Sequence, residues 1–178
     1  MTKQELRVIY KDLRMALPIE LRTTYDQSIR EELLIHLGNK KNVGIFLPIE
    51  KFNEIDLSPL LSVKKYNWYL PISFFLECEM EFAQVNSKTH LVVSPQGISE
   101  PKGTSFIAPS LLDAIVVPML ISDRLGFRVG YGKGFYDYFL KRCKSSCLKI
   151  GVSYFEPIEA ISDVENHDMP LDLCIFPH

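Results

Sequence analysis

The sequence lacks both long apolar runs and concentrated charge. No apolar segment approaches the length that a membrane-spanning helix requires. Lysine and arginine are dispersed and the formal net charge is -2, so no basic block supports nucleic-acid binding. The first residues, MTKQELRVIYKDLR, are charged and unlike a secretory signal. We therefore expect a cytoplasmic protein with no membrane and no nucleic acid among its partners.

Cysteine pairs of the zinc-binding type are also missing. Cys143 and Cys147 lie one helical turn apart, but no second pair or nearby histidine completes a zinc site. Repeats, low-complexity tracts and linker-like segments are absent as well. A chain of 178 residues that is 47% hydrophobic and 24% charged can bury a sizeable core. We expect a single domain over residues 1–178 that acts as a monomer.

Helical and strand patterns alternate along the chain. Thr2 and Glu5 form a capping-box pair before a helix that extends to about Ala16. A second apolar stripe with helical spacing ends at Gly38. Apolar runs typical of strands occur at residues 43–47, 68–70, 80–85, 114–118, 148–152 and 173–176. This order predicts an α/β fold, a three-layer sandwich with a mostly parallel central sheet flanked by helices.

The first helix carries an apolar stripe and several cations. The residues at helical spacing that predict its core-facing side are Leu6, Ile9, Leu13 and Leu17. The cations along its flanks are Lys3, Arg7, Lys11 and Arg14. Periodicity alone therefore predicts that these cations face solvent.

The stretch SDRLGFRVGYGKGFYD, residues 122–137, carries the strongest functional signal. Three of its four glycines alternate at Gly130, Gly132 and Gly134, between the apolar run at 114–118 and a helical pattern that begins at Phe135. Backbone N–H groups in such a turn, and at a helix N-terminus, can bind a phosphate. The glycine spacing differs from the P-loop and from the dinucleotide-binding fingerprint.

Charged residues around these glycines support an anion site. Arg128 and Lys133 supply mobile positive charge, and Asp137 in the first helical turn could hold a divalent metal. A tight turn whose glycines serve geometry alone stays an alternative. Glu54 and Asp168 also follow predicted strands, so we expect them near the glycines at one edge of the sheet.

The segment D-x-x-G-x-R-V-G-Y-G-K-G-F-Y-D, residues 123–137, resembles the signature of 5-formyltetrahydrofolate cyclo-ligases, also called 5,10-methenyltetrahydrofolate synthetases. Four further motifs are similar to those of the family and occur in order along the whole chain. They are Lys3 with Leu6-Arg7, Glu54-Ile55-Asp56, Gly97-Ile98-Ser99-Glu100-Pro101, and His167-Asp168-Met169-Pro170-Leu171-Asp172.

This resemblance implies an ATP-dependent ligase. Its small-molecule substrates would be 5-formyltetrahydrofolate and ATP, with Mg²⁺ as the metal. The products would be 5,10-methenyltetrahydrofolate, ADP and phosphate, formed through a phosphorylated formyl group, an iminium phosphate. Phosphoryl transfer of this kind needs positioning and charge neutralisation, which glycines, cations and a metal supply.

The resemblance also implies roles for individual residues. The ATP-binding set is Lys3, Arg7, Arg128, Gly130, Tyr131, Gly132, Lys133, Gly134, Phe135 and Tyr136, with Lys133 and Arg128 catalytic. The substrate-binding set is Arg7, Phe46, Leu47, Glu54 and Tyr136, and the metal ligands are Asp137 and Asp168. The loop before Glu54 is slightly longer than is usual in the family, so Glu50 stays an alternative to Glu54. The role of His167 stays open.

Two other classes of function remain compatible with the residues. A nucleotide-binding regulatory module would bind ATP without folate turnover. An enzyme similar to phosphosugar isomerases or CoA-transferases would use a carboxylate at a strand end and would need neither ATP nor metal. An assay for methenyl-folate formation with and without ATP separates these readings.

Overall fold

A computed structural model describes residues 1–86, 88–103 and 105–178 of the chain. Its helices are α1 (Lys3–Ala16), α2 (Ile19–Leu37) and α3 (Phe135–Leu140), with short 3-10 turns η1 (Glu50–Phe52), η2 (Ser58–Ser62) and η3 (Pro109–Leu111). Its strands are β1 (Asn42–Gly44), β2 (Asn67–Phe74), β3 (Glu79–Val85), β4 (Leu91–Val93), β5 (Ser99–Pro101), β6 (Ala114–Pro118), β7 (Ile121–Ser122), β8 (Arg128–Val129), β9 (Leu148–Val152) and β10 (Leu173–Ile175).

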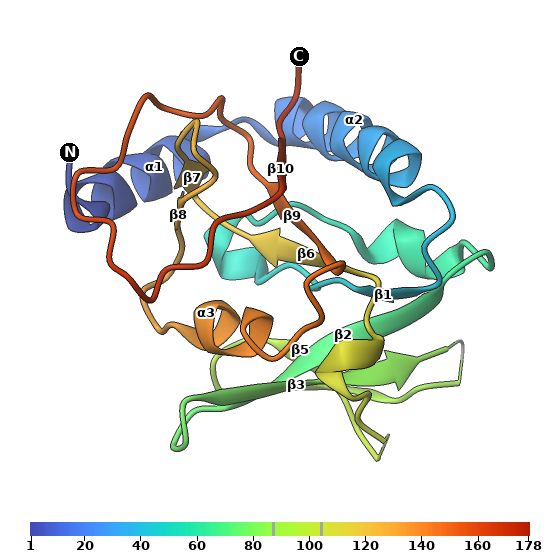
Figure 1. The fold of residues 1–178 in the computed structure, drawn as a ribbon. Coiled ribbons are helices and arrows are strands. Elements are labelled where there is room, and N and C mark those ends of the chain that lie inside the picture. Colours follow the sequence, from blue (N-terminus) through green and yellow to red (C-terminus); the bar gives the residue numbers. More distant parts are fainter. Residues whose placement is uncertain (87, 104) are drawn as a thin grey trace.

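Six strands form the central sheet in the order β10-β9-β6-β1-β2-β3, with helices on both faces (Figure 1). All neighbours run parallel except β2 and β3, which form an antiparallel hairpin at one edge. The predicted α/β fold with a mostly parallel central sheet is therefore confirmed. Two small hairpins, β4–β5 and β7–β8, lie outside this sheet.

The central strands are continuously apolar because both of their faces are covered. In β6, Val116 packs in the cluster that includes Ile29 and Leu33 of α2. Its neighbours Ile115 and Val117 point the other way, into the cluster that includes Phe139 of α3. Successive strand residues point to opposite faces, so a strand covered on both sides needs apolar residues throughout. Within the described residues, no helix has both the length and the apolar character needed to cross a bilayer.

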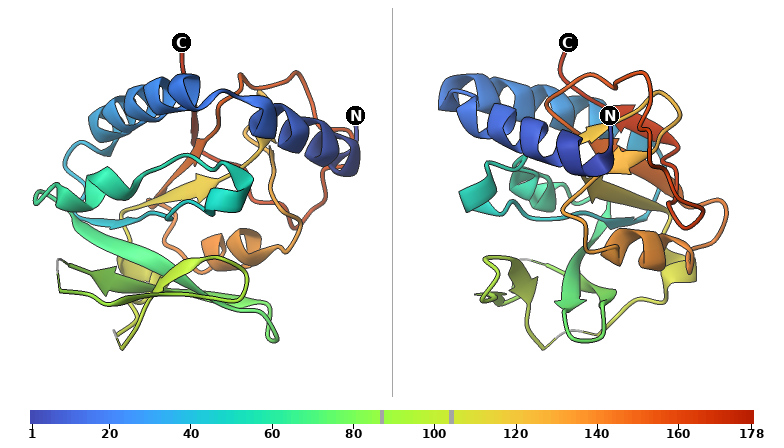
Figure 2. Two further views of the ribbon diagram at one scale, coloured as in Figure 1. Left: turned by 180° about the vertical axis from the view of Figure 1, so that it is seen from behind. Right: turned by 90° about the vertical axis from the view of Figure 1, so that its left-hand side faces the viewer.

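Helix α1 begins as predicted but presents an unexpected face to the protein. Thr2 and Glu5 make both hydrogen bonds of the capping box. Leu6 is 1% exposed, whereas Ile9 and Leu13 are 40% and 46% exposed and Arg14 is 4% exposed. The prediction that Ile9 and Leu13 face the core is therefore wrong. The helix packs beside β8 (Figure 2), and its Arg7 donates to the Gly130 carbonyl of the glycine-rich loop, residues 130–134.

The glycine-rich loop does not follow β6 directly, because the β7–β8 hairpin lies between them. The turn of this hairpin contains Gly126, whose φ of +86° lies in the left-handed region. The N–H of Leu171 donates to the Gly126 carbonyl, 2.9 Å away, so the hairpin is joined to the segment before β10. A Cβ on Gly126 would lie 2.5 Å from the Leu171 carbonyl oxygen, so close packing requires glycine here.

We expect Gly126→Ala to lower the free energy of unfolding by about 3 kcal/mol, because backbone strain adds to a clash with a main-chain oxygen. Gly103→Ala is the matched control. Its φ is +72° and an added Cβ would meet nothing within 4 Å, so it isolates the backbone term. That control should cost about 1 kcal/mol. Equal losses in urea unfolding would show that the Leu171 contact contributes nothing.

Asp113, which immediately precedes β6, ties three parts of the chain together. Its carboxylate accepts hydrogen bonds from the N–H groups of Lys41 and Asn42 at the start of β1. The Lys144 Nζ lies 2.7 Å from its other oxygen. The N–H of Asn42, followed by Lys144, lowers the pKa of Asp113 to about 2.

Because this pKa is lowered, the carboxylate stabilises the fold fully above its unfolded pKa of about 3.9, and the contribution is lost as the pH falls to about 2. The side chain is 25% exposed, so solvent screens the pair. We expect Asp113→Asn to lower the free energy of unfolding by about 1 kcal/mol at neutral pH. The difference should vanish near about pH 2. Urea unfolding at both values tests this, and an equal difference at both would contradict it.

Candidate active site

The glycine-rich loop, residues 130–134, lies between β8 and α3. Gly132 and Gly134 have φ values of +83° and +72°, which glycine adopts without strain. Gly130 has no such conformation, and an added Cβ there would meet nothing within 4 Å. Geometry alone therefore explains two of the three glycines. Lys133 is exposed and makes no ion pair with any residue that the structure describes.

Arg7 joins α1 to this loop. Its Nε donates to the Gly130 carbonyl oxygen at 2.9 Å. Its Nη2 lies 3.2 Å from the position that a Cβ on Gly132 would take. Arg7 is therefore packed across the loop, and the solvent-facing position that periodicity predicted for it is wrong. Lys11, by contrast, is exposed, with its Nζ 5.2 Å from the centroid of the Phe52 ring.

Lys3 is the first residue of α1, one helical turn before Arg7, and it pairs with Asp168. The Lys3 Nζ donates to Asp168 Oδ2, which also accepts from the N–H of Glu165 at 2.7 Å. Burial works to raise the pKa of Asp168, but the Glu165 N–H and the Lys3 ammonium outweigh it, so the pKa lies below its usual value. Lys3, a predicted ATP-binding residue, is thus in direct contact with Asp168, a predicted metal ligand.

Arg128 and Asp137 form a second pair of this kind. The Arg128 Nη2 donates to Asp137 Oδ1 at 2.9 Å, and its Nη1 donates to the Met169 carbonyl at 2.7 Å. The N–H of Met169 donates to the same Asp137 oxygen at 3.0 Å. The Arg128 side chain is only 7% exposed, so its charge is held in place and is not mobile as the sequence suggested. Because Met169 follows Asp168, these contacts bring both predicted metal ligands to one region.

Glu54 reaches the glycine-rich loop from the segment after β1. It is 5% exposed, and its Oε1 accepts from the Tyr131 hydroxyl at 2.6 Å. Its Oε2 accepts from the N–H of Ile49 at 2.7 Å. Burial raises the pKa of Glu54 against the opposing effects of Tyr131, the Ile49 N–H and Arg14. Glu50 lies exposed on η1, so of the two candidates Glu54 is the one in contact with the loop.

The remaining predicted residues lie around this contact or in the core. Burial, followed by the negative charge of Glu54, raises the pKa of Tyr136, so this tyrosine lies on the same side of the site. Phe135 packs edge-on against Phe75, with ring centroids 5.1 Å apart. Two further predicted residues, Phe46 and Leu47, are 5% and 8% exposed and belong to the core cluster below α2.

Sequence reasoning missed the part played by Arg14. Its Nη2 donates to the Tyr131 hydroxyl at 2.5 Å, beside the contact between that hydroxyl and Glu54. A signal was present, since Lys3, Arg7 and Arg14 recur at intervals of four and seven, which places them on one helix face. The apolar stripe of α1 concealed this cationic one.

Comparison with known proteins identifies the relatives of this chain. Residues 1–177 match the model of the 5-formyltetrahydrofolate cyclo-ligase family. The chain belongs to this family. The 5-formyltetrahydrofolate cyclo-ligase of Mycoplasma pneumoniae is 28% identical over 185 residues, which cover 98% of both chains. That of Mus musculus is 26% identical over 189 residues, which cover 98% of this chain and 93% of the relative.

A solved structure supports the same assignment. The NMR structure of Aquifex aeolicus 5,10-methenyltetrahydrofolate synthetase is 33% identical and covers 99% of this chain and 90% of that chain, with a TM-score of 0.84. The resemblance seen in the sequence, and the prediction of an enzyme of the cyclo-ligase family, are confirmed. The family is one of ATP-dependent ligases.

Asp137 and Asp168 could be two of the ligands of a magnesium ion whose remaining ligands are waters or substrate phosphates. No group of three or more metal-binding side chains occurs within residues 1–86, 88–103 and 105–178. Asp137 Oδ2 and Asp168 Oδ1 have no hydrogen-bond partner among these residues. Mg²⁺ commonly takes one or two carboxylates and keeps waters or substrate phosphates as its other ligands. The two free oxygens match that donor set.

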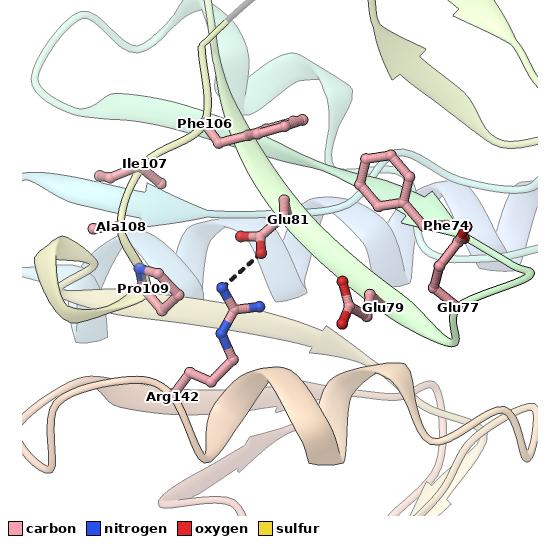
Figure 3. Close-up of a pocket in the computed structure, with 9 residues that line it drawn as sticks. All are labelled: Phe74, Glu77, Glu79, Glu81, Phe106, Ile107, Ala108, Pro109 and Arg142. Carbon is pink, nitrogen blue, oxygen red and sulfur yellow. Dashed lines mark hydrogen bonds and ion pairs between the residues drawn. The ribbon is translucent and has the colours of Figure 1, made fainter.

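Two hollows lie away from these contacts. A cavity of about 680 Å³ lies between the β2–β3 hairpin and the segment before β6, where Arg142 donates to Glu81 (Figure 3). A second, of about 370 Å³, lies between the tip of that hairpin and α3. Neither is lined by any of the predicted site residues. The candidate active site is instead the surface where α1, the glycine-rich loop, Glu54 and the segment before β10 meet.

Proposed function

We propose that the protein catalyses the ATP- and Mg²⁺-dependent conversion of 5-formyltetrahydrofolate to 5,10-methenyltetrahydrofolate, with release of ADP and phosphate. Membership of the cyclo-ligase family supports the reaction. The hydrogen bond between Tyr131 and Glu54 is the observation that relates this reaction to particular residues. It joins the glycine-rich loop, which is of a kind that binds phosphate, to a buried carboxylate. A nucleotide and a polar ring can therefore be bound side by side.

The chemistry needs ATP because a formamide oxygen is a poor leaving group. The formyl oxygen attacks the γ-phosphorus, the bond from that phosphorus to the β-phosphate oxygen breaks, and ADP leaves. The resulting iminium phosphate is attacked at its carbon by N10, which loses its proton, and the carbon–oxygen bond then breaks to release phosphate. The protein contributes mainly by holding the two substrates in line and neutralising charge.

Cations on two elements would bind the phosphates. Lys133 is exposed and unpaired among the described residues, and Arg7 already lies over the loop. Lys3 would exchange part of its contact with Asp168 for a phosphate oxygen. Arg128 would act differently, because its guanidinium holds Asp137 and the Met169 carbonyl. Its place is to orient the metal ligand beside the phosphates.

Asp137 and Asp168 would hold Mg²⁺, which when bound would neutralise phosphate charge during phosphoryl transfer. Glu54 would accept two hydrogen bonds from the adjacent N–H donors on one edge of the pterin. Tyr136 would line the ring beside it, and Phe46 and Leu47 would close the pocket from the core side.

The direct test is the absorbance of the methenyl product, measured with purified protein, Mg²⁺ and 5-formyltetrahydrofolate, with and without ATP. We expect product only with ATP, and one ADP for each product formed. ATP binding without folate turnover would favour a regulatory module. Turnover of another substrate without ATP or metal would favour the isomerase-like or transferase-like reading.

Glu54→Gln should raise the Michaelis constant for 5-formyltetrahydrofolate about tenfold or more, because an amide turns one buried acceptor into a donor. Binding of ATP, measured without folate, should be unchanged. Glu50→Gln is the control, since Glu50 is an exposed glutamate four residues earlier in the same segment. A defect in the Glu50 variant with none in the Glu54 variant would assign the pterin carboxylate to Glu50.

Asp137→Asn should lower turnover by about tenfold or more and weaken Mg²⁺ binding to the enzyme–ATP complex, measured by calorimetry. Excess Mg²⁺ should restore part of the turnover. Asp172→Asn is a suitable control, because its carboxylate pairs with Lys149 on the surface. Unchanged Mg²⁺ affinity in the Asp137 variant would show that Asp137 does not bind the metal and serves only to pair with Arg128.

A further inference from the structure

Three polar side chains from distant parts of the chain form one hydrogen-bonded row. Arg14 at the end of α1 donates to the Tyr131 hydroxyl at 2.5 Å, and this hydroxyl donates to Glu54 Oε1 at 2.6 Å. The two ends of the row are 4% and 5% exposed. Groups buried to this extent are held by their partners, because water is not available to replace a lost bond.

The middle member of the row is fixed on both sides. The Tyr131 ring lies 5.2 Å from the Phe52 ring at an angle of 30°, and the Arg14 guanidinium lies 5.6 Å from its centroid. The other oxygen of Glu54 accepts from the N–H of Ile49. Each carboxylate oxygen can accept a second hydrogen bond. Glu54 is therefore oriented by the protein and still able to accept from two external donors.

The row also favours the form of Glu54 that can accept from both. Burial raises the pKa of Glu54, while Tyr131 and the Arg14 charge oppose the rise. Tyr136 is a further titratable group close to Glu54; burial and the Glu54 charge raise its pKa above the ordinary value, so it adds no charge beside the carboxylate. An ionised carboxylate offers acceptors only, whereas a protonated one would present a donor to a pterin N–H.

Tyr131 stands between Gly130 and Gly132, so its backbone belongs to the glycine-rich loop while its hydroxyl, held by Arg14 and Glu54, links that loop to the carboxylate. We propose that Arg14 and Tyr131 are positioning residues for Glu54, and that through them nucleotide binding at the loop is coupled to folate binding. This inference rests on the proposed function of the site. It assigns the Tyr131 side chain to the folate side of the site and its backbone to the nucleotide side.

Tyr131→Phe keeps the ring and removes only the hydroxyl. We expect the Michaelis constant for 5-formyltetrahydrofolate to rise about tenfold, while ATP binding measured without folate changes by less than about twofold. The acid limb of the folate kcat/KM profile should move to higher pH, because Glu54 loses a donor that favours its ionised form. Tyr10→Phe is the matched control, since Tyr10 packs edge-on against Phe155 and its hydroxyl has no partner among the described residues.

Arg14 is tested by a conservative and a disruptive change. Arg14→Lys keeps a positive charge and should recover most of the folate affinity that Arg14→Met loses. Combining Arg14→Met with Tyr131→Phe should add little to the worse single variant, because both act on Glu54 through the same hydroxyl. If the losses of folate affinity in the two single variants multiply in the double variant, Arg14 and Tyr131 do not act on Glu54 as one unit.

Coupling is measured without turnover, by titrating folate into the protein with and without a non-hydrolysable ATP analogue. In the unmodified protein the analogue should change the folate dissociation constant by about fivefold or more, and in Tyr131→Phe by less than about twofold. An equal effect of the analogue in both proteins would overturn the coupling.

The remaining outcomes separate the two proposals. Normal folate kinetics in Tyr131→Phe, with an active unmodified enzyme, would overturn the positioning role and leave the proposed function intact. An unmodified protein that binds folate without turning it over would contradict the proposed function, while the binding titrations still decide the row. An unmodified protein that binds no folate would overturn both.

Discussion

The packing of the cationic face of α1 onto the glycine-rich loop is the constraint on which the site depends. Arg7 bonds the Gly130 carbonyl, Arg14 bonds the Tyr131 hydroxyl, and Lys3 reaches Asp168 beyond the loop. These contacts draw the first residues of the chain onto elements more than a hundred positions away. Without this helix the loop would keep its glycines and the bond from Tyr131 to Glu54, but it would lose three neighbouring cations.

Four charged side chains of the candidate site pair with one another in the structure. The pairs of Lys3 with Asp168 and of Arg128 with Asp137 each join a cation to a carboxylate at low exposure. A buried ion of either sign is costly unless it is paired, so the protein can hold these groups close together only as pairs. ATP and Mg²⁺ would bring charges of both signs, so that Lys3 could exchange Asp168 for a phosphate oxygen while Asp168 took Mg²⁺ in its place.

Much of the scaffold was predictable because strands that are covered on both faces of the sheet are continuous apolar runs in the sequence. The apolar runs at 114–118 and 148–152 coincide with β6 and β9, and the helical stripe that stops at Gly38 coincides with α2. The β7–β8 hairpin escaped prediction because its strands have two residues each, too few for any periodicity.

The sequence indicated residues of the candidate site but not the contacts between them. The glycine spacing, the flanking charges and the strand-end positions of Glu54 and Asp168 were visible, and the resemblance to the cyclo-ligase family suggested their roles. The bond of Tyr131 to Glu54, by contrast, crosses 77 positions and leaves no local pattern. The orientation of α1 was predicted wrongly because its apolar residues outnumber the sites that can bury them. Leu6 alone among them is buried, and the inward surface is taken by arginine.

The small number of buried apolar residues in α1 has a consequence for the dynamics of the molecule. The sheet is held by residues with no exposed surface, such as Ile115 and Val116, whereas α1 is held largely by hydrogen bonds and ion pairs. Local unfolding proceeds most easily where few apolar contacts must be broken. We therefore expect local opening of helix α1, which carries Lys3, Arg7 and Arg14, to cost less free energy than opening of the sheet.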